Sequence, residues 1–207
     1  MTRTHRLKIL YVVVLLALLA LALLLGAALY PSLGLPALFA VGLLLFVPGR
    51  IQGVFFRDFF RGRRLLGSGQ PAQALVPFRR FREQVQRNPW QKRLLWLAWG
   101  FYSTDIEAMT WNNIGAAHIE LGEWSAAREA LGQALAIDGE YPLPHFNRAL
   151  IATAEGDRQE AQREAEAARR LGYRETSTDE LIQQAGYLLA RIEGRGAEPR
   201  ADAGTRG

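Results

Sequence analysis

Three histidines are the side chains of this chain best suited to proton transfer or metal binding near neutral pH. They are His5, His118 and His145, and no two of them lie within four residues of each other. No His-Glu-x-x-His pair and no acidic metal-binding loop accompanies them, although such spacings place ligands on one side of an ion. The sequence therefore predicts no metal site, and we expect His118 to be a hydrogen-bonded histidine of a helical core.

Residues for covalent or phosphoryl chemistry do not occur in the patterns in which they act. The chain has no cysteine, which excludes thiol nucleophiles, disulfides and zinc-thiolate sites. No serine lies in a Gly-x-Ser-x-Gly motif, and the glycines from Gly62 to Gly69 do not form a phosphate-binding loop. One acidic cluster has spacings typical of an exposed helix face: Glu155, Asp157, Glu160, Glu164 and Glu166. We expect no catalytic residue, no cofactor and no enzymatic activity, which leaves binding as the expected function.

The charge is divided between two parts of the chain. Residues 1–93 carry 14 Lys and Arg against 2 acidic side chains, a net charge of +12. Residues 94–207 carry 11 basic against 18 acidic side chains, a net charge of −7. Because the basic part also holds the apolar segments, we expect it to meet an anionic lipid surface and not nucleic acid.

An uncharged segment near the N-terminus predicts a membrane anchor. Ile9 to Leu29 is 21 residues long, and as a helix it spans roughly 32 Å, enough for the apolar core of a bilayer. A second, shorter apolar run extends from Leu35 to Val47. Basic residues before the first run and after the second favour a cytoplasmic location for both ends. We predict a transmembrane helical hairpin over residues 1–49 in the cytoplasmic membrane; a re-entrant second run and a cleaved signal peptide are the alternatives.

Residues 50–107 form a basic juxtamembrane segment. Its phenylalanines recur at helical spacing beside arginines, which is typical of an amphipathic helix on a lipid surface. The expected membrane-surface residues are Arg57, Arg61, Arg63, Arg64, Phe55, Phe56, Phe59 and Phe60. In the alternative interpretation, this helix is the first of a repeat and its aromatic side chains face the core.

Two copies of one pattern, offset by 34 residues, fill the region 108–174. The offset aligns Gly122 with Gly156, Ala127 with Ala161, Ala134 with Ala168, and Asn113 with Asn147. A fixed period of this length is typical of stacked helical repeats. Small residues at Gly115 and Ala127 allow two antiparallel helices to approach closely, and Gly122 suits a left-handed cap.

The pattern resembles the tetratricopeptide repeat. The first copy, residues 108–141, matches that motif at Trp111, Ile114, Gly115, His118, Gly122, Ala127, Leu131 and Ala134. The second copy, residues 142–174, is weaker, because His145, Arg148 and Ala165 replace large apolar residues. The resemblance covers about a third of the chain closely and implies an all-α fold in which helix pairs stack into a short solenoid.

Flanking segments extend this solenoid. A shift of 53 residues aligns Gly62, Gly69, Ala74 and Phe78 with Gly115, Gly122, Ala127 and Leu131, which predicts a degenerate third copy over residues 55–88. The aromatic insertion from Trp90 to Glu107 either dips into the membrane interface or forms a core helix. Thr104 and Glu107 form a predicted capping box, so the next helix should begin near Asp105.

The C-terminal part predicts the end of the solenoid. Ser177 and Glu180 form a second capping box at the start of a capping helix over residues 175–193, with Gly194 as its stop. A polar side suits a terminal helix that faces water. We expect residues 194–207 to be disordered.

The resemblance also implies a ligand site, because the first helix of each tetratricopeptide unit lines a concave groove for peptides. The corresponding residues are Met109, Asn112, Asn113, Ala116, Ile119, Leu143, Phe146, Asn147, Leu150 and Thr153. Positions that hold Lys or Arg in carboxylate-clamp members are apolar or neutral here, which favours an apolar or helical ligand. Asn113 and Asn147 either bond a ligand backbone or serve as scaffold residues, and the capping helix is an alternative occupant of the groove.

Three functional hypotheses follow. The first is a membrane-anchored adaptor or scaffold that binds a protein or peptide partner at the cytoplasmic face. The second is a lipid-surface or membrane-shaping protein that uses the hairpin, the Phe/Arg helix and the Trp-rich insertion. The third is an accessory subunit of a membrane complex, packed through Trp96 and Trp99. The sequence predicts no particular partner or oligomeric state.

Overall fold

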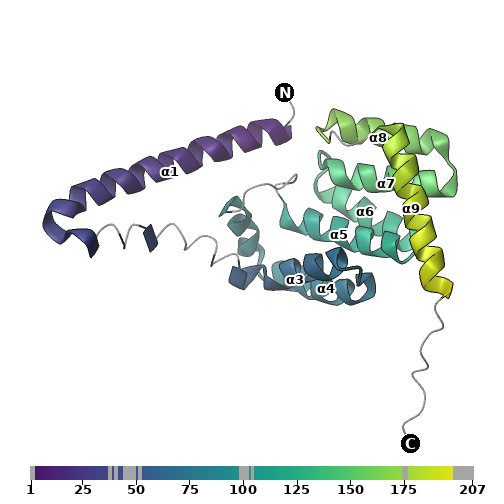
Figure 1. Cartoon of the computed structure of the whole chain (residues 1–207), viewed down its shortest axis with the longest axis horizontal. Coiled ribbons are helices and arrows are strands. Elements are labelled where there is room, and N and C mark those ends of the chain that lie inside the picture. Colours follow the sequence, from purple (N-terminus) through teal and green to yellow (C-terminus); the bar gives the residue numbers. More distant parts are fainter. Residues whose placement is uncertain are drawn as a thin grey trace, which may run out of the picture.

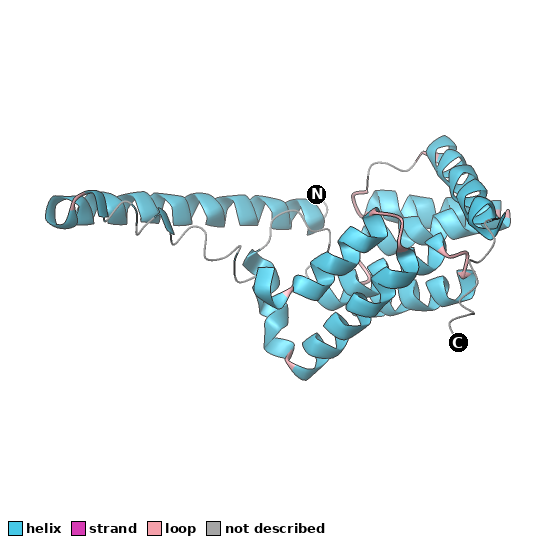
Figure 2. Cartoon of the chain, turned by 60° about the horizontal axis from the view of Figure 1, so that its bottom comes forward, coloured by secondary structure: helices cyan, strands magenta, loops and turns pink. Residues whose placement is uncertain are grey.

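The structure is a computed structural model that describes residues 3–36, 39, 42–43, 50, 53–97, 103, 105–173 and 177–197. Over these residues the chain is all-helical and contains no strand (Figure 2). This confirms the predicted all-α class. The predicted return segment of the hairpin lies mostly outside the described residues, as do Trp99, Thr104 and residues 198–207.

The N-terminal helix α1, Arg3–Leu33, stands apart from the other helices (Figure 1). Within the described part of the chain, its segment Val12–Ser32 is the one stretch long and apolar enough to cross a membrane. Its leucine side chains are largely exposed. Such exposure is unfavourable in water and favourable in the hydrocarbon core of a bilayer.

Most of the remaining helices form consecutive antiparallel pairs (Figure 1). The pairs are α3 (Arg57–Gly67) with α4 (Pro71–Arg87), α5 (Ile106–Glu120) with α6 (Trp124–Ile137), and α7 (Pro142–Glu155) with α8 (Arg158–Arg170). Neighbouring pairs also pack on each other, α4 on α5 and α6 on α7. Each pair therefore covers an apolar side of the next one along the chain.

A glycine with a left-handed backbone follows the first helix of every pair. The φ angles are +74° at Gly69, +73° at Gly122 and +80° at Gly156. A Cβ at such a position would crowd the following carbonyl, so glycine is the least costly residue there. These three glycines are the ones that the 53- and 34-residue offsets align, and the predicted cap at Gly122 is confirmed.

The two helices of a pair approach most closely at one aligned position. A Cβ added to Gly62 would lie 2.5 Å from Phe78 Cε1, and one added to Gly115 would lie 2.7 Å from Leu131 Cδ2. In the third pair the aligned residues are Ala149 and Ala165, which are buried in one small cluster. A glycine thus faces a large side chain in two pairs, and two alanines fill the same contact in the third.

A 3₁₀ helix, η1 (Pro89–Leu97), forms the described part of the aromatic insertion. Its Leu95 is buried in the core cluster of α3, α4 and α5. Gln84 Nε2 donates hydrogen bonds to the Phe55 carbonyl at 2.9 Å and to Gln91 Oε1 at 2.7 Å, which ties α4 to η1 and to the residues just before α3. Leu95 therefore favours the core interpretation of this segment over a membrane-interface one.

The start of α5 is capped by Asp105. The Asp105 carboxylate accepts hydrogen bonds from the amides of Glu107 at 2.7 Å and Ala108 at 3.3 Å. Asp105 therefore satisfies the first free amides of this helix, whereas the predicted cap residue Thr104 lies outside the described residues. The predicted start near Asp105 agrees with the observed start at Ile106.

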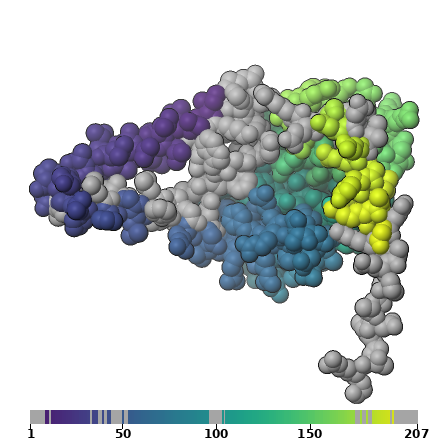
Figure 3. All heavy atoms as spheres, in the orientation of Figure 1, coloured from purple at the N-terminus to yellow at the C-terminus, as the bar shows by residue number. Residues whose placement is uncertain are grey.

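The last described helix, α9 (Thr178–Ala197), crosses the ends of earlier helices and lies against them in the space-filling view (Figure 3). Its predicted capping box is confirmed: Glu180 N donates to Ser177 Oγ at 3.2 Å, and Ser177 N donates to Glu180 Oε2 at 2.9 Å. Hydrogen bonding of the Glu180 carboxyl with the Ser177 amide, and then with the Ser177 side chain, lowers the pKa of that carboxyl below its ordinary value. Gly194 does not stop the helix as predicted, because α9 continues to Ala197.

Candidate binding cleft

The helices predicted to line a groove, α5 and α7, are joined through their own polar side chains. Asn147 Nδ2 donates a hydrogen bond of 2.9 Å to Oδ1 of the buried Asn112. Asn113 Nδ2 donates to the Met109 carbonyl at 2.8 Å, and Thr153 Oγ1 donates to the Ala149 carbonyl at 2.8 Å. These contacts support the scaffold interpretation of the asparagines, because a buried amide is normally satisfied within the protein.

Several predicted groove residues are buried and do not line an open surface. They are Met109, Asn112, Ile119 and Phe146. Met109 belongs to the core cluster of the first two pairs, and the Phe146 ring packs on Tyr173 with 4.8 Å between centroids. These four side chains therefore offer little surface to a ligand in this structure, and their assignment to a binding groove stays a prediction. The others, Asn113, Ala116, Leu143, Asn147, Leu150 and Thr153, are half-buried.

Helix α9 occupies one end of the predicted groove. Leu188 is buried in a cluster with Ile119, and Leu150 and Ile192 pack against the same cluster. Ile192 also lies over the turn between α5 and α6, where its Cγ2 would be 3.2 Å from a Cβ at Gly122. The structure thus agrees with the alternative that the capping helix of the chain fills part of the groove.

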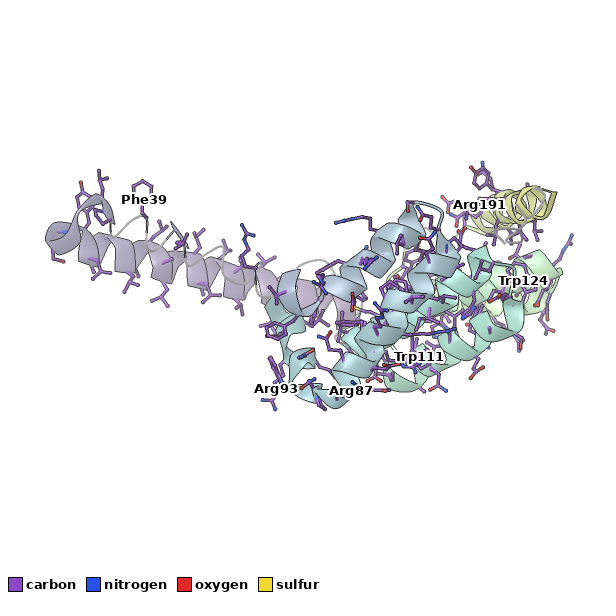
Figure 4. The ribbon with its side chains drawn as sticks, turned by 90° about the horizontal axis from the view of Figure 1, so that it is seen from below. Phe39, Arg87, Arg93, Trp111, Trp124 and Arg191 are labelled. Carbon is purple, nitrogen blue, oxygen red and sulfur yellow. The ribbon has the colours of Figure 1, made fainter. Side chains whose placement is uncertain are left out.

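An open cleft of about 370 Å³ remains beside α9. It is lined by Glu120 of α5, Leu150 of α7, and Gln183, Gln184, Tyr187, Leu188 and Arg191 of α9. Tyr187 is 73% exposed, so most of its surface is available to a ligand. Arg191 (labelled in Figure 4) forms an ion pair with Glu120 and ties α9 to α5. The cleft therefore offers an apolar floor and a largely neutral rim.

The α9 side of this cleft was missed by sequence reasoning. The predicted polar side of the capping helix includes Gln183 and Gln184, which are exposed, whereas Tyr187, also exposed, was not predicted to belong to any site. Their spacing already places them on one side of a helix beside Leu188. The spacing does not predict that α9 lies across α5 and α7, and the cleft depends on that position.

An ion-pair network joins α6, α7 and α8. Arg128 donates to Glu160 at 2.7 and 2.9 Å and to Glu155 at 2.6 Å. Arg148 continues the network, with nitrogen–oxygen distances of 3.6 Å to Glu160 and 3.2 Å to Glu164. Glu160 and Glu164 are only partly exposed, which corrects the prediction that the acidic cluster is simply a solvated helix face.

The network sets the ionisation of Glu160. Its hydrogen bond with Arg128 lowers the pKa of the Glu160 carboxyl below the ordinary value of 4.5, against the opposing effect of burial, and the Arg128 and Arg148 charges add to the lowering. The same hydrogen bond raises the pKa of the Arg128 guanidinium above its ordinary value. Both side chains are charged at neutral pH and hold the second and third pairs together.

The histidines with described side chains have carboxylate partners. His118 Nδ1 lies 2.5 Å from Glu123 Oε2, and His145 Nδ1 lies 2.6 Å from Glu164 Oε2. His118 is buried, as expected of a satisfied core histidine. In the described part of the chain, no three His, Asp or Glu residues come together in a way that could hold a metal ion.

The predicted membrane-surface residues separate into two groups. Phe56 and Phe59 are fully buried and pack edge-on or tilted against Phe81, with 5.5 Å between ring centroids in both cases. Phe55 and Phe60 are half-buried against the same core. Phe56 and Phe59 therefore do not face lipid, and the alternative core assignment is correct for these two residues. Arg57, Arg61, Arg63 and Arg64 are exposed.

Comparison of the chain with protein-family models, with curated proteins and with solved structures finds no match.

Proposed function

We propose that this chain is a membrane-anchored adaptor whose tetratricopeptide-like helical domain binds a helical segment of a partner protein in the α9 cleft. The observation that carries the proposal is the cleft itself, with Leu150 and Leu188 at its floor and the exposed Tyr187 at its rim. A surface of this kind binds an apolar side of a helix, as in helix-in-groove recognition.

A helical partner is favoured by the way in which α9 itself packs on the domain. Helix α9 lies across α5 and α7 through Ala185 and Leu188, which are buried, while its polar residues face outward. A second amphipathic helix can pack beside α9 in the same manner. The paired Glu120 and Arg191 leave no excess charge among the lining residues, which argues against a free carboxylate as the ligand.

The repeat architecture is supported by the aligned contacts of the three helix pairs. Gly62 with Phe78 and Gly115 with Leu131 repeat one close approach at the 53-residue offset. Scaffolds of stacked pairs commonly act through extended binding surfaces. Because α1 restricts the domain to a membrane, a partner in the same membrane meets it at a high effective concentration, and a cleft of modest affinity suffices.

The cleft is tested by photo-crosslinking in cells. A photoreactive phenylalanine analogue replaces Tyr187, and the matched control carries it at Val76, which is exposed on α4 and does not line the cleft. We expect a protein adduct from position 187 but not from position 76, lost when Gln184→Arg places a charge in the cleft. Peptide mapping should locate the adduct on an apolar helix side of the partner. A crosslink only within the chain, or equal adducts at both positions, would show that the cleft does not bind a partner.

The orientation of the domain is tested separately. The arginines that follow the apolar segments favour a cytoplasmic domain. Because the chain has no cysteine, Gly132→Cys introduces a single thiol, at an exposed α6 position where a Cβ meets nothing within 4 Å. A membrane-impermeant maleimide should label it only after the membrane is permeabilised. Labelling of intact cells would place the domain on the outer side.

A further inference from the structure

The exposed side of α3 carries a row of arginines. Arg57, Arg61 and Arg64 are spaced by four and three residues, so they share one side of the helix. The opposite side holds the buried Phe59 and Gly62, which pack against α4. The helix is therefore amphipathic, and its core contacts fix the arginines toward solvent.

These arginines differ from the arginines that hold the helices of the domain together. Arg128, Arg148 and Arg191 are paired with carboxylates, and Arg82 stacks over the Trp111 ring at 4.3 Å. Among the described contacts, Arg57, Arg61 and Arg64 have neither an acidic partner nor an aromatic one. The acidic residue of α3, Asp58, lies half-buried in its first turn. The row is thus a uniformly positive surface without internal neutralisation.

We propose that the arginine row of α3, defined as Arg57, Arg61 and Arg64, binds anionic lipid headgroups of the bilayer that holds α1. Arg57 follows Ser32, the end of the apolar segment, by 25 residues, so the headgroups are always within reach of the row. Guanidinium groups bind phosphate through paired N–H donors. The contact holds the helical domain against the membrane and orients the stack relative to it.

This inference rests on the membrane anchor of the proposed function, but not on the α9 cleft. Near an anionic membrane surface each arginine contributes a factor of roughly five to the equilibrium constant of contact. Loss of all three arginines should therefore reduce that constant by about two orders of magnitude. The effect should weaken with salt, because exposed charges are screened.

The test uses the full chain in bilayers with a single label. Gly67→Cys places a fluorophore in α3, at an exposed position where a Cβ meets nothing within 4 Å, and Gly132→Cys places it on α6 as a distant reference. Quenching by a headgroup-attached quencher is compared between phosphatidylcholine bilayers with and without phosphatidylglycerol. We expect phosphatidylglycerol to increase quenching at position 67 but not at 132, and added salt to reverse the increase.

Two matched variants then distinguish the effect of the arginine row from the effect of net charge. One replaces Arg57, Arg61 and Arg64 with glutamine, and the other replaces Arg79, Arg80 and Arg93, which are also exposed. The first should abolish the phosphatidylglycerol effect, and the second should preserve it. Equal losses in both, or no dependence on phosphatidylglycerol in the wild type, would overturn the proposal. So would protection of the α3 label by an RNA pool in place of anionic lipid.

Failure of the anchor is distinguishable from failure of the arginine row. If the wild-type chain is not recovered with the bilayers after flotation, the membrane part of the proposed function is wrong, and this inference falls with it. If it is recovered but α3 shows no lipid-dependent quenching, only the inference is wrong.

Discussion

Both carboxylate oxygens of Glu160 accept hydrogen bonds from the Arg128 guanidinium, at 2.7 and 2.9 Å. The two residues are 32 positions apart in sequence and join α6 to α8, so the contact fixes the second helix pair against the third. Glu160 has a pKa below its ordinary value for this reason. The pair therefore makes the stability of the stack depend on pH.

Glu160→Gln should destabilise the domain by about 1–2 kcal/mol at neutral pH, because Arg128 and Arg148 lose a charged partner. The folded-state pKa of Glu160 is lower than 4.5, so the stabilisation is complete above that pH and is lost as pH falls through the folded value. Urea unfolding followed by circular dichroism should show the difference between wild type and variant shrinking below pH 4.5. Glu129→Gln, at an exposed position of the same helix as Arg128, is the control. An E160Q difference that stays constant on acidification would contradict this pH dependence.

Gly115→Ala should destabilise the domain by about 1–3 kcal/mol, because the new methyl group would lie 2.7 Å from Leu131 and force the two helices apart. Gly132→Ala, at an open helical position, should instead stabilise it by up to about 1 kcal/mol. In the Leu131→Ala background, the cost of Gly115→Ala should nearly vanish, because the two alanines copy the contact of Ala149 with Ala165. Additive costs in the double variant would show that this contact does not set the helix spacing.

The turn glycines should respond differently to alanine. Gly156→Ala meets no neighbouring atom, so it measures only the left-handed backbone, at a cost of about 1–2 kcal/mol. Gly122→Ala should cost more, because its Cβ also meets Ile192 of α9 at 3.2 Å. Truncation by Ile192→Ala should remove the excess and leave the backbone cost. The measurement is thermal unfolding of the three single variants and of the Gly122→Ala/Ile192→Ala double variant. If Gly122→Ala and Gly156→Ala cost the same with Ile192 present, α9 does not lie against this turn.

Asn112→Ala should destabilise the domain by about 1–2 kcal/mol, because it removes a buried group that accepts from Asn147 across α5 and α7. Asn113→Ala loses only a contact to the helix backbone at Met109 and gains helix propensity, so its effect should be close to zero. Comparison of the two by urea unfolding tests the scaffold role. A larger loss of stability for Asn113→Ala than for Asn112→Ala would contradict the scaffold role and favour the hypothesis that Asn113 binds a ligand.

Much of the fold is predictable because its signals are local. The small residues at Gly115 and Ala127, the left-handed turn at Gly122 and the Ser177–Glu180 capping box each depend on a few neighbouring positions. The environment of the Phe/Arg helix was harder to predict, because an amphipathic helix has the same sequence pattern whether its apolar side meets lipid or protein. The burial of Phe56 and Phe59 depends on Phe81 of another helix, which periodicity does not reveal.

The candidate site was less predictable for a related reason. The predicted groove residues lie on α5 and α7. Helix α9 packs against Ile119 and Leu150, and the cleft that remains is lined in part by α9 residues. Glu160 and Glu164 have the spacing of a solvated helix side, and only their distant partners Arg128 and Arg148 change that interpretation. A single sequence therefore predicts which segments form helices, but it does not predict how helices that are distant in sequence pack on one another.

The docking of α9 also orders events during synthesis. Each helix pair packs mainly on its neighbour along the chain, so the pairs can fold one after another as they leave the ribosome. Helix α9 is different, because its Arg191 and Ile192 reach back to Glu120 and Gly122. The cleft therefore forms only after translation has passed α9, and a nascent chain stalled earlier lacks it.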